Sequence, residues 1–597
     1  RIMREKWLSV NWRELIIKTL MMLSYVFWIY LAMPASENGK IVGCGLLIII
    51  FFFVIKMSMS EYLDGIVSKG KKTVFFISII IALYYIGTYY YQSGEGVSVR
   101  RMSGMAVLEF PAIYLSVLYF TGNGKKMKKD EKIRRIFEKG QQALPKCLGI
   151  TAVLLLVIYS ASYSIWFDET FTIGLIQHSY KELIYLTGRD VHPPLYYILL
   201  KGFTESIRFV LPQVPTIYLA RLFSGIPYAI LLIFLLSMRK TIEDRLISDI
   251  MLLALCMPNF MDYGIEVRMY SLALVLIFFA YMTGYRIYYG YVQGWKQWII
   301  LAMVSLLSIY THYYCGICVI AIYAFLFFKK LKTGELIRCL ISGSILVIGY
   351  LPWMSILFTT LTSVSERTWP EAVSFKTIFE SVWFLVGYYG TIIIVFPTVL
   401  WGIAAFRKSK KDNAYVLMGV LLPFLLMGLG ELVSALYTPV WQKRYMVIAA
   451  GCMWFAVAQY VKELKSQGYQ IRIISFMAVV GLIDLFVFAR HEQVDKTAAA
   501  AVVKEILIEN PDTTILTYDT EIAYSVSTAM NRKCILGAQI GPYLETIYSR
   551  NLEVHSEVSE EMLQKMKPAL ILMKDTEDIQ EDSDIKVING VAFKKLR

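Results

Sequence analysis

The sequence has few charged side chains and few cysteines. Asp, Glu, Lys and Arg make up 18% of the 597 residues, whereas 57% are hydrophobic and 14% aromatic. So little charge cannot cover the surface of an ordinary soluble protein, which excludes a soluble globular fold. Most of the eight Cys lie inside apolar segments, where a thiol acts as a small hydrophobic group, so we expect neither a disulfide framework nor a zinc site.

Long apolar runs recur along most of the chain, for example Leu15–Met33, Ile41–Met57, Thr73–Tyr91 and Leu148–Ile165. Each is long enough to cross about 30 Å of hydrocarbon as a helix. None has the period-2 alternation of a membrane barrel, and lipid offers no partner for unpaired backbone groups. The runs predict an all-α polytopic membrane protein with roughly 12 to 13 transmembrane helices.

The net charge of +14 comes from Lys and Arg in short loops between apolar runs. This pattern is typical of cytoplasmic loops and of attraction to anionic lipid, so we expect membrane lipid and no nucleic acid as a partner. The basic segments predicted to be cytoplasmic are 125–139, 329–332, 407–411 and 462–472. A helix over 146–166 then runs outward and places Asp168 on the external face of the cell membrane.

The crossings between Asp168 and Lys329 must be odd in number, because the two residues are predicted on opposite faces. The apolar segments between them are one too many. Two segments are candidates for the extra one: Leu195–Val210, which carries three charged residues, and the short run Ile250–Phe260. The sequence leaves both alternatives open.

The composition divides the chain into four regions. Residues 1–125 form an additional four-helix membrane region, 126–145 a basic cytoplasmic linker, 146–490 a transmembrane core and 491–597 a soluble domain. Within the last region the pattern predicts helices over 498–509 and 559–566 and strands over 514–518, 569–573, 585–588 and 591–593. It therefore indicates a small extracytoplasmic α/β domain, read as an accessory domain because it lacks a Gly-rich phosphate loop.

Adjacent carboxylates, Asp168 and Glu169, follow the outward helix, and the segment from Asp190 through His192 to Tyr197 reads DVHPPLYY. A charge near hydrocarbon costs roughly 2.5 to 3.5 kcal/mol, so acids at this depth suggest a function. The alternative is structural: Asp168 caps a helix that begins near Thr170.

Further motifs follow in order, at Glu266-Val-Arg-Met-Tyr270, Thr311-His312-Tyr313 and Lys443-Arg444-Tyr445. Together with Asp168-Glu169 and the DVHPPLYY segment, they resemble the protein O-mannosyltransferase and lipid A aminoarabinose transferase superfamily of GT-C glycosyltransferases. The resemblance covers residues 146 to about 490 and implies a polyprenyl-phosphate-linked sugar donor, an external active site and inversion at the anomeric carbon. The segment 359–377 carries no large insertion, which favours a bacterial member.

The resemblance assigns Asp168 as the catalytic base, with Glu169 positioning the sugar. Arg268 and Arg444 suit the donor phosphate, because a guanidinium can bind two phosphate oxygens at once. The remaining candidates for donor binding are Asp190, His192, Glu266 and Tyr445. The structural alternatives are that Arg444 flanks a helix, that Arg268 pairs with Glu266 or Asp262, and that His192 is a buried, hydrogen-bonded histidine.

His312 has two interpretations. Some relatives hold a divalent metal near the active site, and His312 with Asp168, Asp190 or His192 would supply suitable ligand types. The alternative is a buried His312 that forms hydrogen bonds, which leaves the site without a metal cofactor.

Three functions are compatible with these patterns. The first is an enzyme, a hexosyl- or pentosyltransferase acting on an extracytoplasmic glycan, lipid or protein. The second is a transporter or flippase of lipid-linked sugar, although the sequence shows no convincing internal repeat. The third is a non-catalytic scaffold for envelope assembly. The motif order favours the enzyme.

Overall fold

The computed structural model describes residues 131–161, 165–363, 373–386, 412–437 and 439–463, part of a helix between 470 and 488, and residues 513–596 apart from short gaps at 531, 567–568, 575–584 and 589–590. The predicted N-terminal membrane region 1–125 and the predicted helix 498–509 lie outside the described residues.

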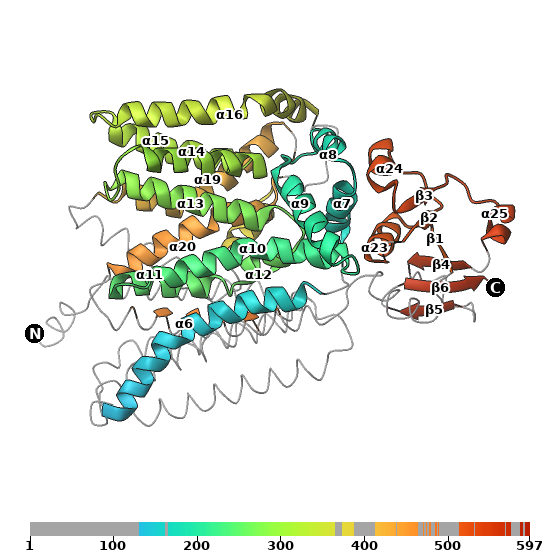
Figure 1. Ribbon diagram of the computed structural model, residues 1–597, viewed down its shortest axis with the longest axis horizontal. Coiled ribbons are helices and arrows are strands. Elements are labelled where there is room, and N and C mark those ends of the chain that lie inside the picture. The colour runs from blue at the N-terminus through green and yellow to red at the C-terminus, as the bar shows by residue number, and fades with distance from the viewer. Residues whose placement is uncertain are drawn as a thin grey trace, which may run out of the picture.

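Most of the described chain folds into a bundle of long helices beside a smaller domain (Figure 1). We call the end of the bundle next to the smaller domain the domain end, and the opposite end the far end. The bundle elements are α6 (Glu131–Tyr159), α7 (Phe167–Ile176), α8 (Tyr180–Thr187), α9 (Leu195–Val210), α10 (Thr216–Ser237), α11 (Ile242–Ala254), α12 (Pro258–Ile265), α13 (Tyr270–Tyr288), α14 (Trp295–Thr311), α15 (Cys315–Lys330), α16 (Leu336–Ser363), α17 (Phe375–Val386), α19 (Ala414–Leu436), η5 (Lys443–Met446) and α20 (Val447–Lys462).

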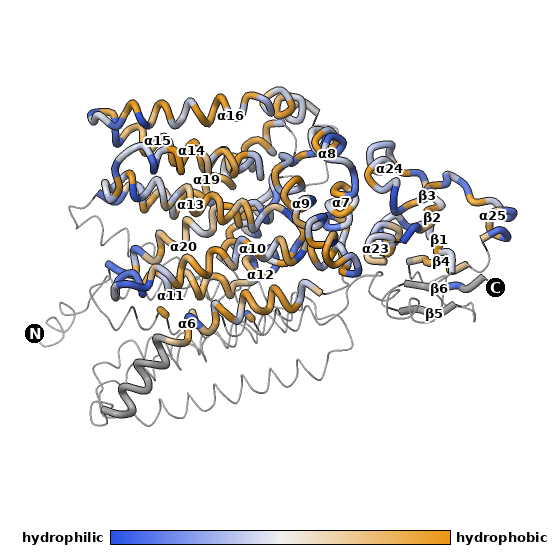
Figure 2. Tube along the Cα trace, in the orientation of Figure 1, coloured by the Kyte–Doolittle hydropathy of each residue, from blue (hydrophilic) through white to orange (hydrophobic). Residues whose placement is uncertain are grey.

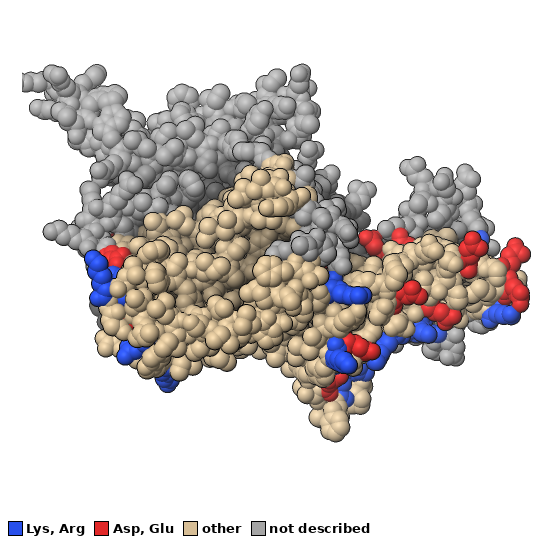
Figure 3. All heavy atoms as spheres, turned by 90° about the horizontal axis from the view of Figure 1, so that it is seen from above, with Lys and Arg blue, Asp and Glu red and all other residues tan. Residues whose placement is uncertain are grey.

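The bundle has the surface of a membrane protein. Five of the described helices are long and apolar enough to cross a membrane, or six if the bent pair α11–α12 is one span. Hydrophobic residues dominate the bundle, with hydrophilic ones at its two ends (Figure 2). In the view of Figure 3, a broad uncharged surface separates the charged side chains of the far end from those near the smaller domain. The predicted helical membrane fold is confirmed.

The two apolar segments that the sequence left open differ in the structure. Helix α9 stays at the domain end beside α7 and α8 (Figure 1). Its Lys201 donates to the Ile176 carbonyl at 3.0 Å and pairs with Glu205 at 2.5 Å, so its charges are satisfied there. The short run Ile250–Phe260 instead belongs to the bent pair α11–α12. Between Asp168 and Lys329, the helices that are long and apolar enough to span a membrane are α10 and α13, with the bent pair α11–α12 as a further candidate.

Both boundaries of helix α6 differ from the helix expected over 146–166. Helix α6 begins at Glu131, inside the segment predicted as a linker, and continues through Pro145 to Tyr159. The sequence predicts a linker over residues 126–145 because they are basic, but basic residues are also compatible with a helix.

Two cysteines, Cys315 and Cys318, are spaced as CxxC, but both are free and fully buried on α15.

The smaller, C-terminal domain contains a six-stranded sheet with the order β3-β2-β1-β4-β6-β5. The pairs among β1 to β4 are parallel, and β6 pairs antiparallel with β4 and β5. Its elements are β1 (Thr514–Thr517), α23 (Thr520–Met530), β2 (Cys534–Leu536), α24 (Pro542–Tyr548), β3 (Leu552–Val554), α25 (Glu560–Lys565), β4 (Ala569–Lys574), β5 (Ile585–Ile588) and β6 (Val591–Leu596). The α/β class is confirmed, and α23, β2, α24 and β3 are additions to the predicted elements.

The C-terminal domain packs on α7 through α23 and α24 (Figure 1). Thr170 and Tyr548 share a buried hydrogen bond of 2.9 Å between their hydroxyl groups. Gly174 lies against Ile547: an added Cβ would meet the Ile547 side chain at 3.0 Å and its carbonyl at 3.2 Å. The close approach leaves little room for a side chain at position 174, and it joins the domain to the helix that carries Asp168 and Glu169.

Candidate functional site

The sequence motifs meet at the domain end of the bundle. The first turn of α7 supplies Asp168 and Glu169, and the loop before α9 supplies Asp190 and His192. The other contributions are Glu266 and Arg268 from the turn between α12 and α13, His312 at the end of α14, and Arg444 and Tyr445 from η5. Hundreds of residues of sequence separate these groups, and the alternating direction of the helices brings them to one place.

Asp168 lies between two arginines. Its Oδ2 accepts from Arg444 Nη1 at 2.7 Å and is 4.0 Å from Arg268 Nε. Burial raises the pKa of Asp168, but the charges of Arg268 and Arg444 outweigh that effect and hold the pKa below its usual value. The carboxylate is therefore ionised at neutral pH. It does not cap a helix that begins near Thr170, because α7 begins at Phe167 and places Asp168 inside the first turn.

Arg268 is almost fully buried and faces His192. Its Nη2 is 3.4 Å from His192 Nδ1 and 3.5 Å from Nε2, and its Nε has no hydrogen-bond partner. The Nδ1 of His192 is also 3.1 Å from Asp190 Oδ2. Burial and the charge of Arg268 lower the pKa of His192, whereas the bond to His192 lowers that of Asp190 despite burial. His192 is thus a neutral link between Asp190 and Arg268.

Arg444 is held by aromatic rings as well as by Asp168. Its guanidinium carbon lies 5.7 Å from the ring centres of both Trp166 and Tyr270, within the range of cation–π attraction. Its Nε has no hydrogen-bond partner. Tyr445 is buried beside it, 5.0 Å from the His312 ring. The position of Arg444 is that of a group in the site, not of a helix flank exposed to solvent.

Glu266 is a half-buried acid with one buried oxygen that is unused. Its Oε1 has no hydrogen-bond partner, and burial raises its pKa to about 8. The group is therefore a neutral carboxylic acid at neutral pH, able to donate one hydrogen bond. The ion pair made by Arg268 is with Asp168.

Glu169 has a different environment from that of Asp168. It is 3% exposed, and its two oxygens accept from Arg221 Nε at 3.0 Å and Nη2 at 2.8 Å. Its Oε1 also accepts from the Val267 N–H at 3.1 Å. Sequence reasoning missed Arg221. The available signal was an arginine inside the apolar segment 216–237, because a charge inside a spanning helix is costly without a partner.

His312 is a buried hydrogen-bonding residue. Its Nδ1 accepts from the Tyr314 N–H at 3.2 Å, and its Nε2 has no partner. Its ring centre lies 5.4 Å from that of His192. Within the described ranges, no three His, Cys, Asp or Glu side chains converge as metal ligands. The described residues therefore do not supply the three-ligand set that the metal interpretation needs.

Unused polar atoms gather around Asp168. Buried atoms without a hydrogen-bond partner include Arg268 Nε, Arg444 Nε, His312 Nε2, Glu266 Oε1, Tyr197 Oη and Tyr270 Oη. Most native buried polar groups are paired, so such a group of atoms in one place calls for a ligand. The arginine, tyrosine and neutral glutamic acid groups can all donate, which matches a ligand rich in oxygen acceptors.

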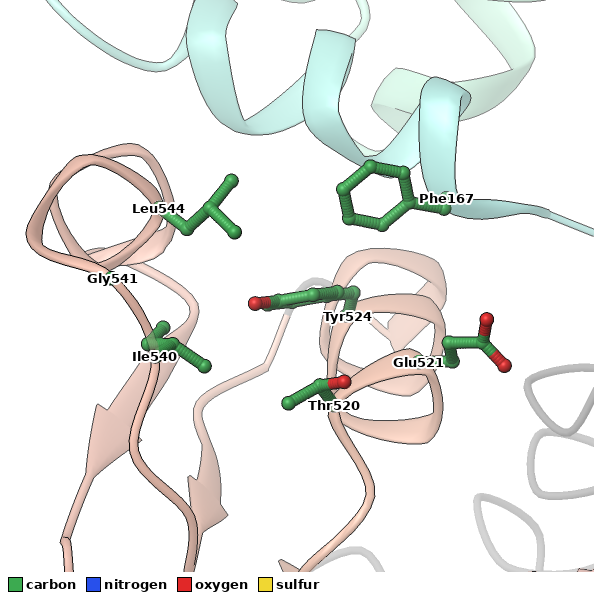
Figure 4. A pocket seen from close by; sticks show the side chains of 7 residues that line it. All are labelled: Phe167, Thr520, Glu521, Tyr524, Ile540, Gly541 and Leu544. Carbon is green, nitrogen blue, oxygen red and sulfur yellow. The ribbon is translucent and has the colours of Figure 1, made fainter. Parts of the chain in front are cut away.

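A pocket of about 330 Å³ opens beside the site, between α7 and the C-terminal domain. Figure 4 shows Phe167 of α7 facing Tyr524 and Leu544 across it. Phe167 directly precedes Asp168. The pocket therefore adjoins the turn that carries the candidate base, and most of its walls come from the C-terminal domain.

The fold and the site define a helical membrane protein with a buried, arginine-containing polar site at one end of its bundle. No family model and no curated protein matches the sequence. Among solved structures, the chain is similar to ArnT from Cupriavidus metallidurans in the apo state, with a TM-score of 0.49 and 9% identity over 75% of this chain and 97% of that one. A likeness at this level carries no argument about activity, which depends on the residues of the site.

Proposed function

We propose that the chain is an inverting glycosyltransferase. It takes a sugar from a polyprenyl-phosphate carrier and transfers it to an acceptor hydroxyl on a glycan, lipid or protein. The domain end would then face the outside of the cell, with the C-terminal domain on the acceptor side. The basic residues of the far end, among them Lys329 and Lys330, support this orientation by the positive-inside rule.

One observation carries the proposal: the Asp168 carboxylate lies between the buried guanidinium of Arg268 and the half-buried guanidinium of Arg444, and the Nε atoms of both are buried without a hydrogen-bond partner. Arg268 and Arg444 balance the charges of Asp168 and Asp190, while Arg221 balances Glu169 and Glu266 is neutral. A phosphodiester therefore meets no excess negative charge, and the free N–H groups can bind its oxygens.

The same arrangement suits the transfer step. The acceptor oxygen attacks the anomeric carbon while Asp168 takes the proton of its hydroxyl group. The bond between the anomeric carbon and the phosphate oxygen breaks, and its electron pair stays on the phosphate. Asp168 thus loses one negative charge as the phosphate gains one. Arg268 and Arg444, already placed around the carboxylate, then stabilise the leaving phosphate without reorganisation.

The test is transfer of radiolabelled sugar from polyprenyl-phosphate donors in membranes that contain wild-type protein or Asp168→Asn at equal expression. Loss of a general base should lower the rate by about 10²- to 10⁴-fold. Asp519→Asn is a matched control, because Asp519 is a carboxylate of the C-terminal domain outside the site. Its transfer rate should equal that of the wild type.

Other outcomes point elsewhere. Full transfer by Asp168→Asn would remove Asp168 from the mechanism. Movement of lipid-linked sugar across liposomes with its linkage intact would instead identify a flippase, the main competing function. Absence of both activities with every donor tried would favour the scaffold.

A further inference from the structure

The Glu169–Arg221 pair is the most deeply buried ion pair near the site, and the transfer step makes no use of it. The exposed fractions of the two side chains are 3% and 5%. The pair is bidentate, with both Glu169 oxygens bound by the guanidinium of Arg221. Both Glu169 oxygens are already hydrogen-bonded within the protein, and the side chain is only 3% exposed, which favours a structural role over contact with a sugar.

Glu169 also holds the turn that carries Arg268. Its Oε1 accepts from the N–H of Val267, and the N–H of Arg268 in turn donates to the Glu266 carbonyl at 2.7 Å. One carboxylate thus connects α7, α10 and the turn between α12 and α13. Because Asp168 precedes Glu169 and Arg268 follows Val267, these bonds fix the two site residues relative to each other.

A second set of contacts fixes α10 in the same place. Ser224, one turn after Arg221, shares a hydrogen bond of 2.8 Å with Tyr196 on α9. Its carbonyl accepts from the Ser271 hydroxyl on α13 at 2.7 Å. Arg221 therefore lies on a helix that is hydrogen-bonded to both α9 and α13. These bonds suit a residue that must keep Glu169 at a fixed distance from α10.

We propose that Arg221 and Glu169 are positioning residues that set the Arg268 turn at the correct distance from Asp168 for binding the donor phosphate. This inference rests on the proposed function. Arg221 also neutralises the carboxylate next to Asp168, so that Glu169 adds no net repulsion to an incoming anion.

The experiment compares two double variants of equal charge and similar burial. Glu169→Leu/Arg221→Met removes the pair while leaving no unpaired charge, a replacement that proteins often tolerate. Arg239→Met/Asp249→Leu removes the buried pair at the far end and serves as the control. The probe is a polyprenyl phosphate titrated into purified protein in detergent, with the melting temperature recorded for each variant.

We expect the Glu169→Leu/Arg221→Met variant to bind the polyprenyl phosphate roughly 10- to 100-fold more weakly, because small displacements in such a site are costly. The control should bind as the wild type does. Hydrogen exchange at the Val267 amide should be faster only in the first variant. Unchanged affinity together with faster exchange at Val267 would overturn the positioning role.

Arg221→Lys covers the case in which the double variant does not fold. It keeps the charge but loses the bidentate geometry. It should remain folded, with the KM for the donor raised and the kcat lowered, because Arg268 binds the donor phosphate and also stabilises it as it leaves. Wild-type parameters in this variant would also overturn the proposal. If the wild-type protein neither binds a polyprenyl phosphate nor transfers sugar, the proposed function itself fails. The exchange measurement at Val267 does not depend on a ligand, so it distinguishes this result from a failure of the positioning role.

Discussion

The two ends of the bundle use buried charge in different ways. At the far end, Arg239 pairs with Asp249 and Lys330 with Glu335, and in each pair the charges are in direct contact. At the domain end, Arg268 and Arg444 share one carboxylate and keep unused N–H groups. The difference teaches that a buried ion pair alone does not indicate a binding site. The feature that indicates the proposed site is a carboxylate shared by two arginines that keep unpaired N–H donors.

The largest expected effect is on stability at the far end. Arg239→Gln removes the cation in direct contact with buried Asp249 and leaves only the charges of Arg245 and Lys146 near it, which should lower the free energy of unfolding by up to about 3 to 5 kcal/mol. Denaturation in detergent measures this change. Affinity for a polyprenyl phosphate should stay at the wild-type value in the folded fraction. Weaker binding at constant stability would contradict the inference that the far-end pair contributes to stability and not to phosphate binding.

The next effect is on binding at the domain end. Arg268→Gln removes a charged donor from the site, which should weaken binding of a polyprenyl phosphate by roughly 2 to 3 kcal/mol, or about 100-fold. The melting temperature should change less than in Arg239→Gln, because Asp168 keeps its bond to Arg444. Equilibrium titration gives the affinity. Wild-type affinity in Arg268→Gln would show that the spare donors are not the phosphate site.

A smaller effect depends on pH. Burial raises the pKa of Glu266 to about 8, so the group is neutral below that pH and ionised above it. The charged groups that face it are Arg444, Asp168, Glu169 and Arg268. Ionisation adds a negative charge to a site for an anion, so affinity for the phosphate should fall by up to about tenfold between pH 7 and 9.

Glu266→Gln is the variant that checks the pH effect. The amide stays neutral and keeps a donor, so binding should no longer fall across this pH range. Affinity measured at pH 7, 8 and 9 in both proteins decides the matter. An equal fall in the two proteins would assign the pH dependence to another group.

The smallest effect is at the exposed edge of the far end. Lys329 pairs with Asp412 at 2.6 Å, but the two side chains are 38% and 42% exposed. Water and salt screen such a pair, so Lys329→Met should change stability by less than about 1 kcal/mol and leave binding unchanged. A loss as large as that of Arg239→Gln would mean that exposure does not separate the two kinds of pair.

The sequence predicts the membrane fold well because long apolar runs have few other uses. It also places the motifs that contain Asp168, Arg268 and Arg444 next to predicted helix ends. It cannot show that these ends converge, because convergence depends on the direction of every helix between them. The role of α9 illustrates this: its charges were visible, but its place at the domain end depends on contacts with Ile176.

The partner of Glu169 shows a second limit. Adjacent acids suggest adjacent roles, yet the structure gives Asp168 spare donors and gives Glu169 a closed pair with Arg221. Fifty-two positions separate Glu169 from Arg221, and no local pattern joins them. The docking of the C-terminal domain on α7 has no sequence signal either, because Thr170, Gly174 and Tyr548 are ordinary residues for their elements.

The contact between Tyr548 and Thr170 also has a consequence for biogenesis. Helix α7 is synthesised early, whereas the domain that packs on it is the last part of this sequence to leave the ribosome. A nascent chain already inserted in the membrane would hold Asp168 on a helix without its final support. The full packing around the turn that carries Asp168 would therefore form only after the C-terminal residues are made and folded.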